Sequence, residues 1–362
     1  MLTQCSSLRR LLPALALAAA APVFLPGCLS HAPGAHERRK GDEIVVAGQF
    51  FHTGTPVVLW MDPGGYDAYR VQRRFGPYDE SDYETSRPHL DAPRTPNRYD
   101  ARDRTLTPEE IDTVRGGGWD LPTLQSNVDQ FVLHFDEAGT ARTCFKILQD
   151  TRDLSVHFML DEDGTIYQTL DLKERARHAT ISNNRSVGIE IANIGAYARE
   201  DAGPLLEWYK KQPDGRTVLA IPERFGLKAE RRPHFKGRPA RREMIRGEVQ
   251  GQELSQYDFT PWQYQALARL TATLCTVLPR ITCDYPRDAA GQLMTRKLPA
   301  AQWKDYHGVL GHYHIQTNKV DPGPALQWDY VIGRARQLMG LPPVPAVDGK
   351  FRAHAARLMV DN

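Results

Sequence analysis

Four short, largely apolar segments in the middle of the chain constrain its fold most strongly. They are residues 128–135, 156–160, 166–170 and 186–193. Their lengths are typical of buried strands, and Glu162-Asp163-Gly164-Thr165 joins the second and third as a hairpin turn. Residues 143–150 have helical spacing, and Thr260-Pro261 opens a longer helix. Strands mixed with helices predict the α/β fold class, with a central mixed β-sheet flanked by helices.

Length and composition narrow the class of protein. With 362 residues, the chain can form one large domain or two ordinary ones. Hydrophobic residues make up 41% and charged residues 25%, which are the proportions of a folded globular protein. The formal net charge is only +2, so the chain lacks a strongly basic footprint and we expect no nucleic-acid partner.

The N-terminus has the features of an export signal. Arg9 and Arg10 precede an apolar run at residues 11–24, which is shorter than the ~20 residues of a membrane-spanning helix. Leu25-Pro26-Gly27-Cys28 then resembles a bacterial lipobox, so we expect residues 1–27 to be a signal peptide and Cys28 to carry a lipid anchor. Leu29 follows this cysteine, and a residue other than aspartate there resembles lipoproteins sorted to the outer membrane of Gram-negative cells, where the protein would face the periplasm. An ordinary cleaved signal, with Cys28 incidental, is the alternative.

The remaining cysteines determine whether the folded protein can contain a disulfide. Exclusion of Cys5 and Cys28 leaves Cys144, Cys275 and Cys283. In an oxidising space, Cys275 and Cys283 are close enough in sequence to form a disulfide, and unpaired core thiols are the alternative. We expect Cys144 to be a buried free thiol.

Composition also divides the chain into segments. Residues 28–43 are polar and basic and are expected to form a tether. Residues 44–120 combine two short strand-like runs with irregular Pro- and Arg-rich sequence, which predicts an N-terminal extension that wraps the main domain and carries no catalytic group. The main domain is expected at residues 121–340, with a basic insertion at 196–257 and a tail at 341–362.

One polar segment near the C-terminus suits a metal site. His312 precedes Asp321 by nine positions, Lys319 lies two before Asp321, and Pro322-Gly323-Pro324 comes directly after it. Histidine and aspartate are both zinc ligands, and an irregular loop can aim both at one ion. Taken alone, the segment is equally compatible with a polar surface loop.

Five segments in a fixed order resemble one enzyme family. They are Phe131-Val132-Leu133-His134; Leu154-Ser155-Val156-His157-Phe158 with Asp163-Gly164-Thr165-Ile166-Tyr167-Gln168; Ala176-Arg177-His178-Ala179; Asn184-Arg185-Ser186-Val187-Gly188-Ile189-Glu190; and Gly311-His312 through Lys319-Val320-Asp321-Pro322-Gly323-Pro324. Over about residues 125–340, the chain resembles the zinc-dependent N-acetylmuramoyl-L-alanine amidases of the amidase-2 type, which share the peptidoglycan recognition protein fold. With the lipobox, it is most similar to the outer-membrane lipoprotein branch of that family.

The resemblance implies a site with one zinc ion. His134, His312 and Asp321 match the three zinc ligands, which leaves the fourth position for water, as a hydrolytic site requires. Glu190, inside an otherwise apolar strand, matches the acid and base beside that water, and Lys319 matches the lysine that faces the oxyanion. Without the resemblance, a glutamate on the wet face of an edge strand and a solvated loop lysine are the alternatives.

Other residues are assigned by the same resemblance. His178 and Asn184 match positions that line the substrate groove, and Arg177 replaces the tryptophan that is usual before His178. His157 and His314 are expected to be core or supporting histidines rather than zinc ligands.

The implied reaction is hydrolysis of the amide bond between the lactyl group of N-acetylmuramic acid and the L-alanine of the stem peptide. The implied substrates are peptidoglycan or muropeptides, and we expect a monomer. A non-catalytic peptidoglycan-binding module is the alternative function, and zinc content would distinguish the two. A zinc peptidase that acts within the stem peptide is a third, which nothing in the sequence favours.

Overall fold

The computed structural model describes residues 34, 36, 38–73, 76–89, 97–102, 119–225 and 235–343. The expected signal peptide, Cys28 and most of the expected tether lie outside the described residues, as does the expected tail from residue 344 onward. The chain divides into residues 1–38 and a compact unit of residues 39–362, and the second unit holds every described helix and strand. Within the described residues, no helix is long and apolar enough to cross a membrane.

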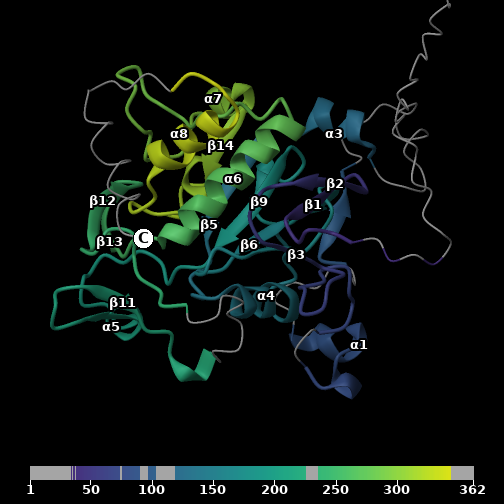
Figure 1. Cartoon of the computed structure of the whole chain (residues 1–362), viewed down its shortest axis with the longest axis horizontal. Coiled ribbons are helices and arrows are strands. Elements are labelled where there is room, and N and C mark those ends of the chain that lie inside the picture. Colours follow the sequence, from purple (N-terminus) through teal and green to yellow (C-terminus); the bar gives the residue numbers. More distant parts are fainter. Residues whose placement is uncertain are drawn as a thin grey trace, which may run out of the picture. The chain divides into compact units, whose positions relative to one another are not determined.

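A six-stranded mixed sheet forms the centre of the compact unit (Figure 1). Its strands, in order, are β14 (Gly308–Gly311), β5 (Gln130–Phe135), β9 (Ser186–Ile191), β6 (Phe158–Leu160), β7 (Ile166–Gln168) and β3 (Val57–Leu59). Neighbouring strands are parallel except β6 and β7, which form the predicted antiparallel hairpin. The four predicted strands are thus confirmed as β5, β6, β7 and β9, and the predicted α/β fold class is correct.

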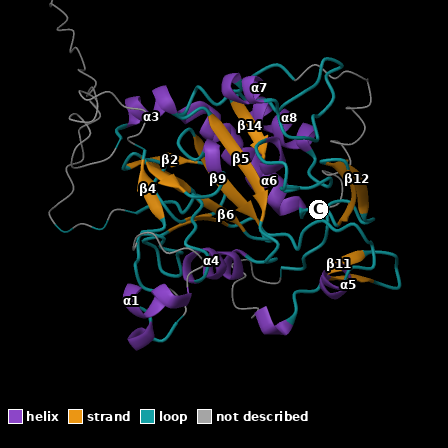
Figure 2. Ribbon diagram, turned by 180° about the vertical axis from the view of Figure 1, so that it is seen from behind, coloured by secondary structure: helices purple, strands orange, loops and turns teal. Residues whose placement is uncertain are grey.

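Helices cover both faces of the sheet (Figures 1 and 2). α6 (Pro261–Val277) packs on α8 (Trp328–Leu338) over one face, and α4 (Ala141–Asp150) packs on the other. α6 starts, as predicted, with Thr260 as its cap and Pro261 at the first helical position, and a capping box fixes this start. Thr260 Oγ1 accepts a hydrogen bond from Gln263 N at 3.1 Å, while Gln263 Oε1 accepts one from Thr260 N at 2.9 Å.

Alternation of side chains along the strands separates the core from the site. Phe131, Leu133 and Phe135 of β5 enter the core with α6, whereas His134 points to the face that α4 covers. Glu190 of β9 points the same way as His134. The two polar side chains therefore emerge together near the carboxyl ends of neighbouring strands.

The N-terminal part of the chain is built into the domain. β1 (Glu43–Val46) and β2 (Gln49–His52) form a hairpin, and β4 (Tyr99–Ala101) pairs antiparallel with β8 (Glu174–Ala176). β3 is an edge strand of the central sheet, although the sequence predicts a wrapping extension before a domain that starts at residue 121. The sequence indicates a strand-like run here, but its pairing with β7 joins segments far apart in the chain, and no local pattern reveals that pairing.

The insertion expected at residues 196–257 contains regular structure. α5 (Gly203–Trp208) precedes the hairpin of β10 (Tyr209–Lys211) and β11 (Thr217–Leu219), and a second hairpin pairs β12 (Ile245–Val249) with β13 (Gln252–Gln256). Residues 226–234 of the basic stretch lie outside the described residues. The other described helices are α1 (Tyr83–Ser86), α3 (Leu121–Asn127) and α7 (Ala300–Asp305), with 3-10 turns at Tyr78–Glu80, Arg87–His89, Thr180–Ser182, Glu223–Phe225 and His312–His314.

Three cysteines lie within the described residues, and all are buried free thiols. Cys144, in α4, is free as predicted, and it lines the cavity of the candidate site. Cys275 and Cys283 are not bonded, so the structure corresponds to the alternative of unpaired core thiols.

Candidate active site and metal centre

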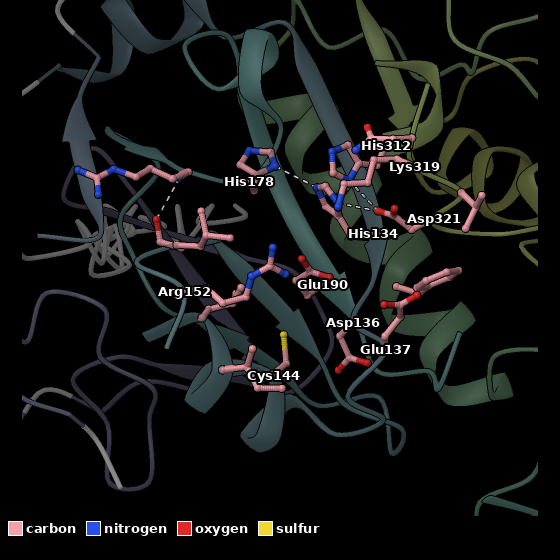
Figure 3. Close-up of a pocket in the computed structure, with 18 residues that line it drawn as sticks. His134, Asp136, Glu137, Cys144, Arg152, His178, Glu190, His312, Lys319 and Asp321 are labelled. Carbon is pink, nitrogen blue, oxygen red and sulfur yellow. Dashed lines mark hydrogen bonds and ion pairs between the residues drawn. The ribbon is translucent and has the colours of Figure 1, made fainter. Parts of the chain in front are cut away.

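The sheet topology brings two histidines and a glutamate together at the carboxyl ends of neighbouring strands. β5 and β9 are parallel, and their register pairs His134 with Glu190. β14 flanks β5 on the other side and ends at Gly311, which pairs with Leu133. His312 comes immediately after Gly311, so it lies beside His134 (Figure 3). Carboxyl ends of parallel strands are where α/β sheets commonly place their sites.

The segment after His312 folds back and returns Asp321 to the site. Tyr313 N donates a hydrogen bond to the Asp321 carbonyl at 3.2 Å. Gln250 Nε2, in the turn between β12 and β13, donates to the carbonyls of Tyr313 and Gln316 at 2.8 and 2.9 Å. A 3-10 turn and these cross-links therefore fix a segment that the sequence predicts to be an irregular loop.

The three expected metal ligands converge on one point. His134 Nδ1 lies 2.8 Å from Asp321 Oδ2 and 3.0 Å from His312 Nδ1, and His312 Nδ1 lies 3.0 Å from Asp321 Oδ2. All three side chains are buried. Two atoms bound to a tetrahedral zinc at about 2.0–2.1 Å are about 3.3 Å apart, so one ion fits after small outward shifts.

The protonation states of His134 and Asp321 suit a cation. Burial lowers the pKa of His134 to about 4, and the neighbouring His312 contributes to the lowering. Burial alone would raise the pKa of Asp321, but His312 and His134 hold it well below its usual range. A neutral imidazole beside an ionised carboxylate is the form that binds a metal ion.

Each histidine of the triad has a partner on its other ring nitrogen. His134 Nε2 lies 3.0 Å from His178 Nδ1, and His312 Nε2 lies 2.6 Å from Gln316 Oε1. The amide oxygen of Gln316 can only accept, so His312 carries its proton on Nε2 and leaves Nδ1 free to bind a metal.

Glu190 places a carboxylate beside the triad. Its Oε2 atom is buried without a hydrogen-bond partner, and the side chain lines the same cavity. Burial raises the pKa of Glu190 well above its usual range, Asp321 and Asp136 raise it further, and Lys319 opposes the shift. Such a group suits the acceptance and return of a proton.

The site opens into a cavity of about 250 Å³ (Figure 3). Lys319 lines it, together with Arg152, Asp136 and Glu137, which the sequence did not single out. Arg152 lies just after α4 and points toward Glu190 (Figure 3). Asp136 and Glu137 come directly after the strand that ends near His134, and this adjacency was a signal for them, whereas no sequence signal identified Arg152.

The structure separates the two residues expected to bind substrate. His178 lines the cavity, whereas Asn184 is not among the residues that line it. The Asn184 side-chain oxygen accepts a hydrogen bond from Arg175 Nε, and its carbonyl accepts one from Arg102 at 2.9 Å. Asn184 thus accepts hydrogen bonds from two arginine side chains and does not line the cavity.

Arg177 also lines the cavity, but it is almost fully buried. One of its terminal nitrogens lies 3.0 Å from Asp100 and the other lies 3.0 Å from Asp153. Asp100 belongs to β4, so the N-terminal part of the chain holds this side chain in the cavity wall.

The two histidines expected to be supporting residues lie outside the triad. His314 Nδ1 accepts a hydrogen bond from Gly311 N at 2.8 Å, and His314 Nε2 lies 2.6 Å from the Met294 carbonyl. His157 Nδ1 accepts one from Gly188 N at 3.1 Å. Both rings are fully buried and hold backbone in place.

The Amidase_2 family, described as N-acetylmuramoyl-L-alanine amidase, matches residues 124–324, more than half of the 362-residue chain. No curated protein sequence matches the chain. Among solved structures, it is similar to a selenomethionine derivative of AmpD, with 18% identity, 67% of this chain and 89% of that chain covered, and a TM-score of 0.29. AmiD from E. coli, in complex with anhydro-N-acetylmuramic acid-L-Ala-D-gamma-Glu-L-Lys, is 17% identical over 60% of each chain, with a TM-score of 0.31. The endolysin amidase LysCS from Clostridium intestinale URNW is 14% identical over 60% of this chain and 88% of that chain, with a TM-score of 0.29.

The family match spans the whole constellation from His134 to Asp321. The chain therefore belongs to the Amidase_2 family of N-acetylmuramoyl-L-alanine amidases.

Proposed function

We propose that this protein is a zinc-dependent hydrolase of the amide bond between the lactyl group of N-acetylmuramic acid and the L-alanine of the stem peptide. The observation that carries the proposal is the convergence of His134, His312 and Asp321, with Glu190 beside them on the next strand. Two imidazoles, a carboxylate and an adjoining cavity suit one zinc ion that keeps a position for water. The substrate class, peptidoglycan or muropeptides, rests on membership of the Amidase_2 family.

The chain's own residues supply the proton transfers and the charge stabilisation. His134, His312 and Asp321 would hold the zinc ion, which would supply Lewis acidity and lower the pKa of a bound water. Glu190 accepts the proton of the attacking water, because its carboxyl group lies in the same cavity with one oxygen unpaired. The same carboxyl group returns the proton to the L-alanine nitrogen as the C–N bond breaks. Lys319 stabilises the negative charge that develops on the lactyl carbonyl oxygen.

The structure favours a hydrolase over a non-catalytic binding module. A buried carboxylate oxygen without a hydrogen-bond partner costs stability, so Glu190 is expensive for a protein that only binds. A hydrolase needs a carboxylate such as that of Glu190 beside the metal ligands, with a cation such as Lys319 in the same cavity. All of these groups come from one chain, which is consistent with a monomer.

We also propose that the protein is an exported lipoprotein, anchored to the outer membrane through Cys28 and facing the periplasm. The basic start, the apolar run and Leu25-Pro26-Gly27-Cys28 support this proposal. A periplasmic enzyme on that membrane meets both peptidoglycan and the muropeptides released from it.

Digestion of purified peptidoglycan sacculi tests the enzymatic proposal. The full chain, supplied with one equivalent of zinc, is expected to release stem peptides, a chelator should stop the release, and added zinc should restore it. Release that is insensitive to complete metal removal would contradict the zinc requirement. Failure to release peptide at any metal content would contradict the amidase assignment.

A further inference from the structure

His178 forms a hydrogen-bonded link between a metal ligand and the sheet. Its Nδ1 lies 3.0 Å from His134 Nε2, and its Nε2 lies 3.2 Å from Ser186 Oγ (Figure 3 shows the first contact). The His134 and His178 rings meet edge to face, at an interplanar angle of 83°. Both ring nitrogens of His178 thus have partners within the protein, so only the carbon atoms of the ring are left to face the cavity.

The strand beneath His178 leaves room for its ring. A Cβ atom on Gly188 of β9 would lie 2.5 Å from both Cε1 and Nδ1 of His178, closer than any side chain tolerates. Space for the imidazole therefore requires glycine here. The ring sits in a built position between His134 and β9.

Arg102, just after β4, holds the segment that carries His178. Its side chain is 1% exposed. Its Nε donates to the Leu172 carbonyl at 2.9 Å, and a terminal nitrogen donates to the Ser186 carbonyl at 2.8 Å. The other terminal nitrogen donates to the carbonyls of Asn183 and Asn184 at 3.2 and 2.9 Å. These four acceptors lie on both sides of His178 in the sequence, so one guanidinium group holds residues 172–186 in place through hydrogen bonds.

The direction of the hydrogen bonds decides whether His134 can bind a metal. If His134 donates from Nε2 to His178, its Nδ1 carries a lone pair toward His312 and Asp321. If His178 donates instead, a neutral His134 carries its proton on Nδ1, where it blocks the metal. Ser186 can complete the first arrangement, because its hydroxyl oxygen can accept a hydrogen bond from His178 Nε2–H.

We propose that His178 is a positioning residue that keeps the proton of His134 on Nε2, and that Arg102 fixes His178 for this role. The inference rests on the proposed zinc site and assigns a task to the N-terminal part of the chain. A purely substrate-binding role for His178 would affect substrate affinity and leave zinc affinity unchanged. A positioning role weakens zinc binding in the absence of any substrate.

Zinc dissociation constants of the purified full-length protein test the proposal, by competition with a chromogenic chelator. His178→Ala should raise the dissociation constant about 10–100-fold, the usual effect of losing a partner of a metal ligand. His178→Asn should raise it less, because the Asn oxygen can accept the His134 proton. Arg102→Lys should also weaken zinc binding, because lysine cannot reach four carbonyls with one fixed fork.

Arg98 offers a matched control. It is a fully buried arginine from the same part of the chain, and it donates to the carbonyls of Gln149 and Val71, which lie outside the His178 segment. Arg98→Lys should leave zinc affinity unchanged, whatever it does to stability. Ser186→Ala gives a second, milder test that should also weaken zinc binding.

The outcomes separate this proposal from the proposed function. A wild-type protein that binds one zinc ion, with His178→Ala binding it equally tightly, overturns the positioning role and leaves the zinc hydrolase intact. Arg102→Lys and Arg98→Lys variants with equal effects on zinc affinity would overturn the part assigned to Arg102. A wild-type protein that binds no zinc contradicts the proposed function itself.

Discussion

His134 and Glu190 occupy paired positions on the adjacent parallel strands β5 and β9, and both side chains leave the same face of the sheet. Neighbouring strands are about 4.8 Å apart, so the sheet itself fixes a metal ligand beside the carboxylate. β14 adds His312 from the other side of β5. The central sheet thus sets the spacing between the proposed metal ligands and Glu190.

Glu190→Gln should abolish most of the activity without removing the metal. The amide keeps the shape of the side chain but cannot accept a proton, so kcat should fall about 10²–10⁴-fold. Zinc affinity should change little, because Glu190 is not part of the triad. Glu253→Gln, at an exposed position of β13, is the control and should retain activity. A Glu190→Gln variant with wild-type kcat would remove Glu190 from the mechanism.

Lys319→Met should slow the reaction through the charge on the carbonyl oxygen. Loss of the cation from the cavity should lower kcat about 10²–10³-fold, as with other oxyanion-stabilising groups. Lys319→Arg keeps the charge and should be less impaired. Lys304→Met, at an exposed position of α7, serves as the control. Equal steady-state constants for Lys319→Met and Lys304→Met would show that Lys319 has no part in catalysis.

The zinc-free protein should become less stable as the pH decreases, in part because of His157. Burial, with the nearby charge of Arg102, lowers the pKa of His157 to about 3. Between about pH 6.5, the value in the unfolded chain, and pH 3, unfolding takes up a proton that the folded state does not bind. This contribution is therefore present above pH 6.5 and is lost as the pH falls, by up to about 1.4 kcal/mol per pH unit.

Urea unfolding at pH 7 and pH 5 measures this effect. His157→Gln should show a smaller loss of stability between the two pH values than the wild type, although it should be less stable at pH 7. Parallel losses in both proteins would mean that His157 is protonated at pH 5 in the folded state.

Zinc should stabilise the folded protein, and above the dissociation constant the gain should grow with the logarithm of the free zinc concentration. At free zinc 100-fold above the dissociation constant, binding adds about 2.7 kcal/mol to the free energy of unfolding, provided the unfolded chain does not bind it. His312→Ala removes one of three ligands and should lose most of this gain. Denaturant unfolding with and without zinc makes the comparison, and an equal gain in His312→Ala would place the ion elsewhere.

Much of the fold was predictable because its central elements are locally distinctive. The strands around His134 and Glu190 are apolar runs, and Thr260 with Pro261 marks the start of α6. β14 was missed because its Gly-Val-Leu-Gly sequence is too short for a pattern, and it forms through pairing with β5. The run that forms β3 was recognised as strand-like, but its place in the central sheet depends on pairing with β7, which lies far along the chain.

The predicted site residues depended on the family pattern, and the structure added what a pattern does not contain. His134, His312 and Asp321 lie together as that pattern implies. The contact of His178 with His134, and the reach of Arg102 to the segment around it, depend on tertiary hydrogen bonds between distant parts of the chain. No spacing in the sequence encodes these contacts.

The identity of the cleaved bond tests the central claim most directly. Muropeptides are digested in water enriched in oxygen-18, and the products are analysed by mass spectrometry. We predict one labelled oxygen in the lactyl carboxylate of the muramic acid product, and an unlabelled stem peptide with a free L-alanine amine. Label in a peptide carboxylate, or cleavage within the stem peptide or the glycan, would contradict the account.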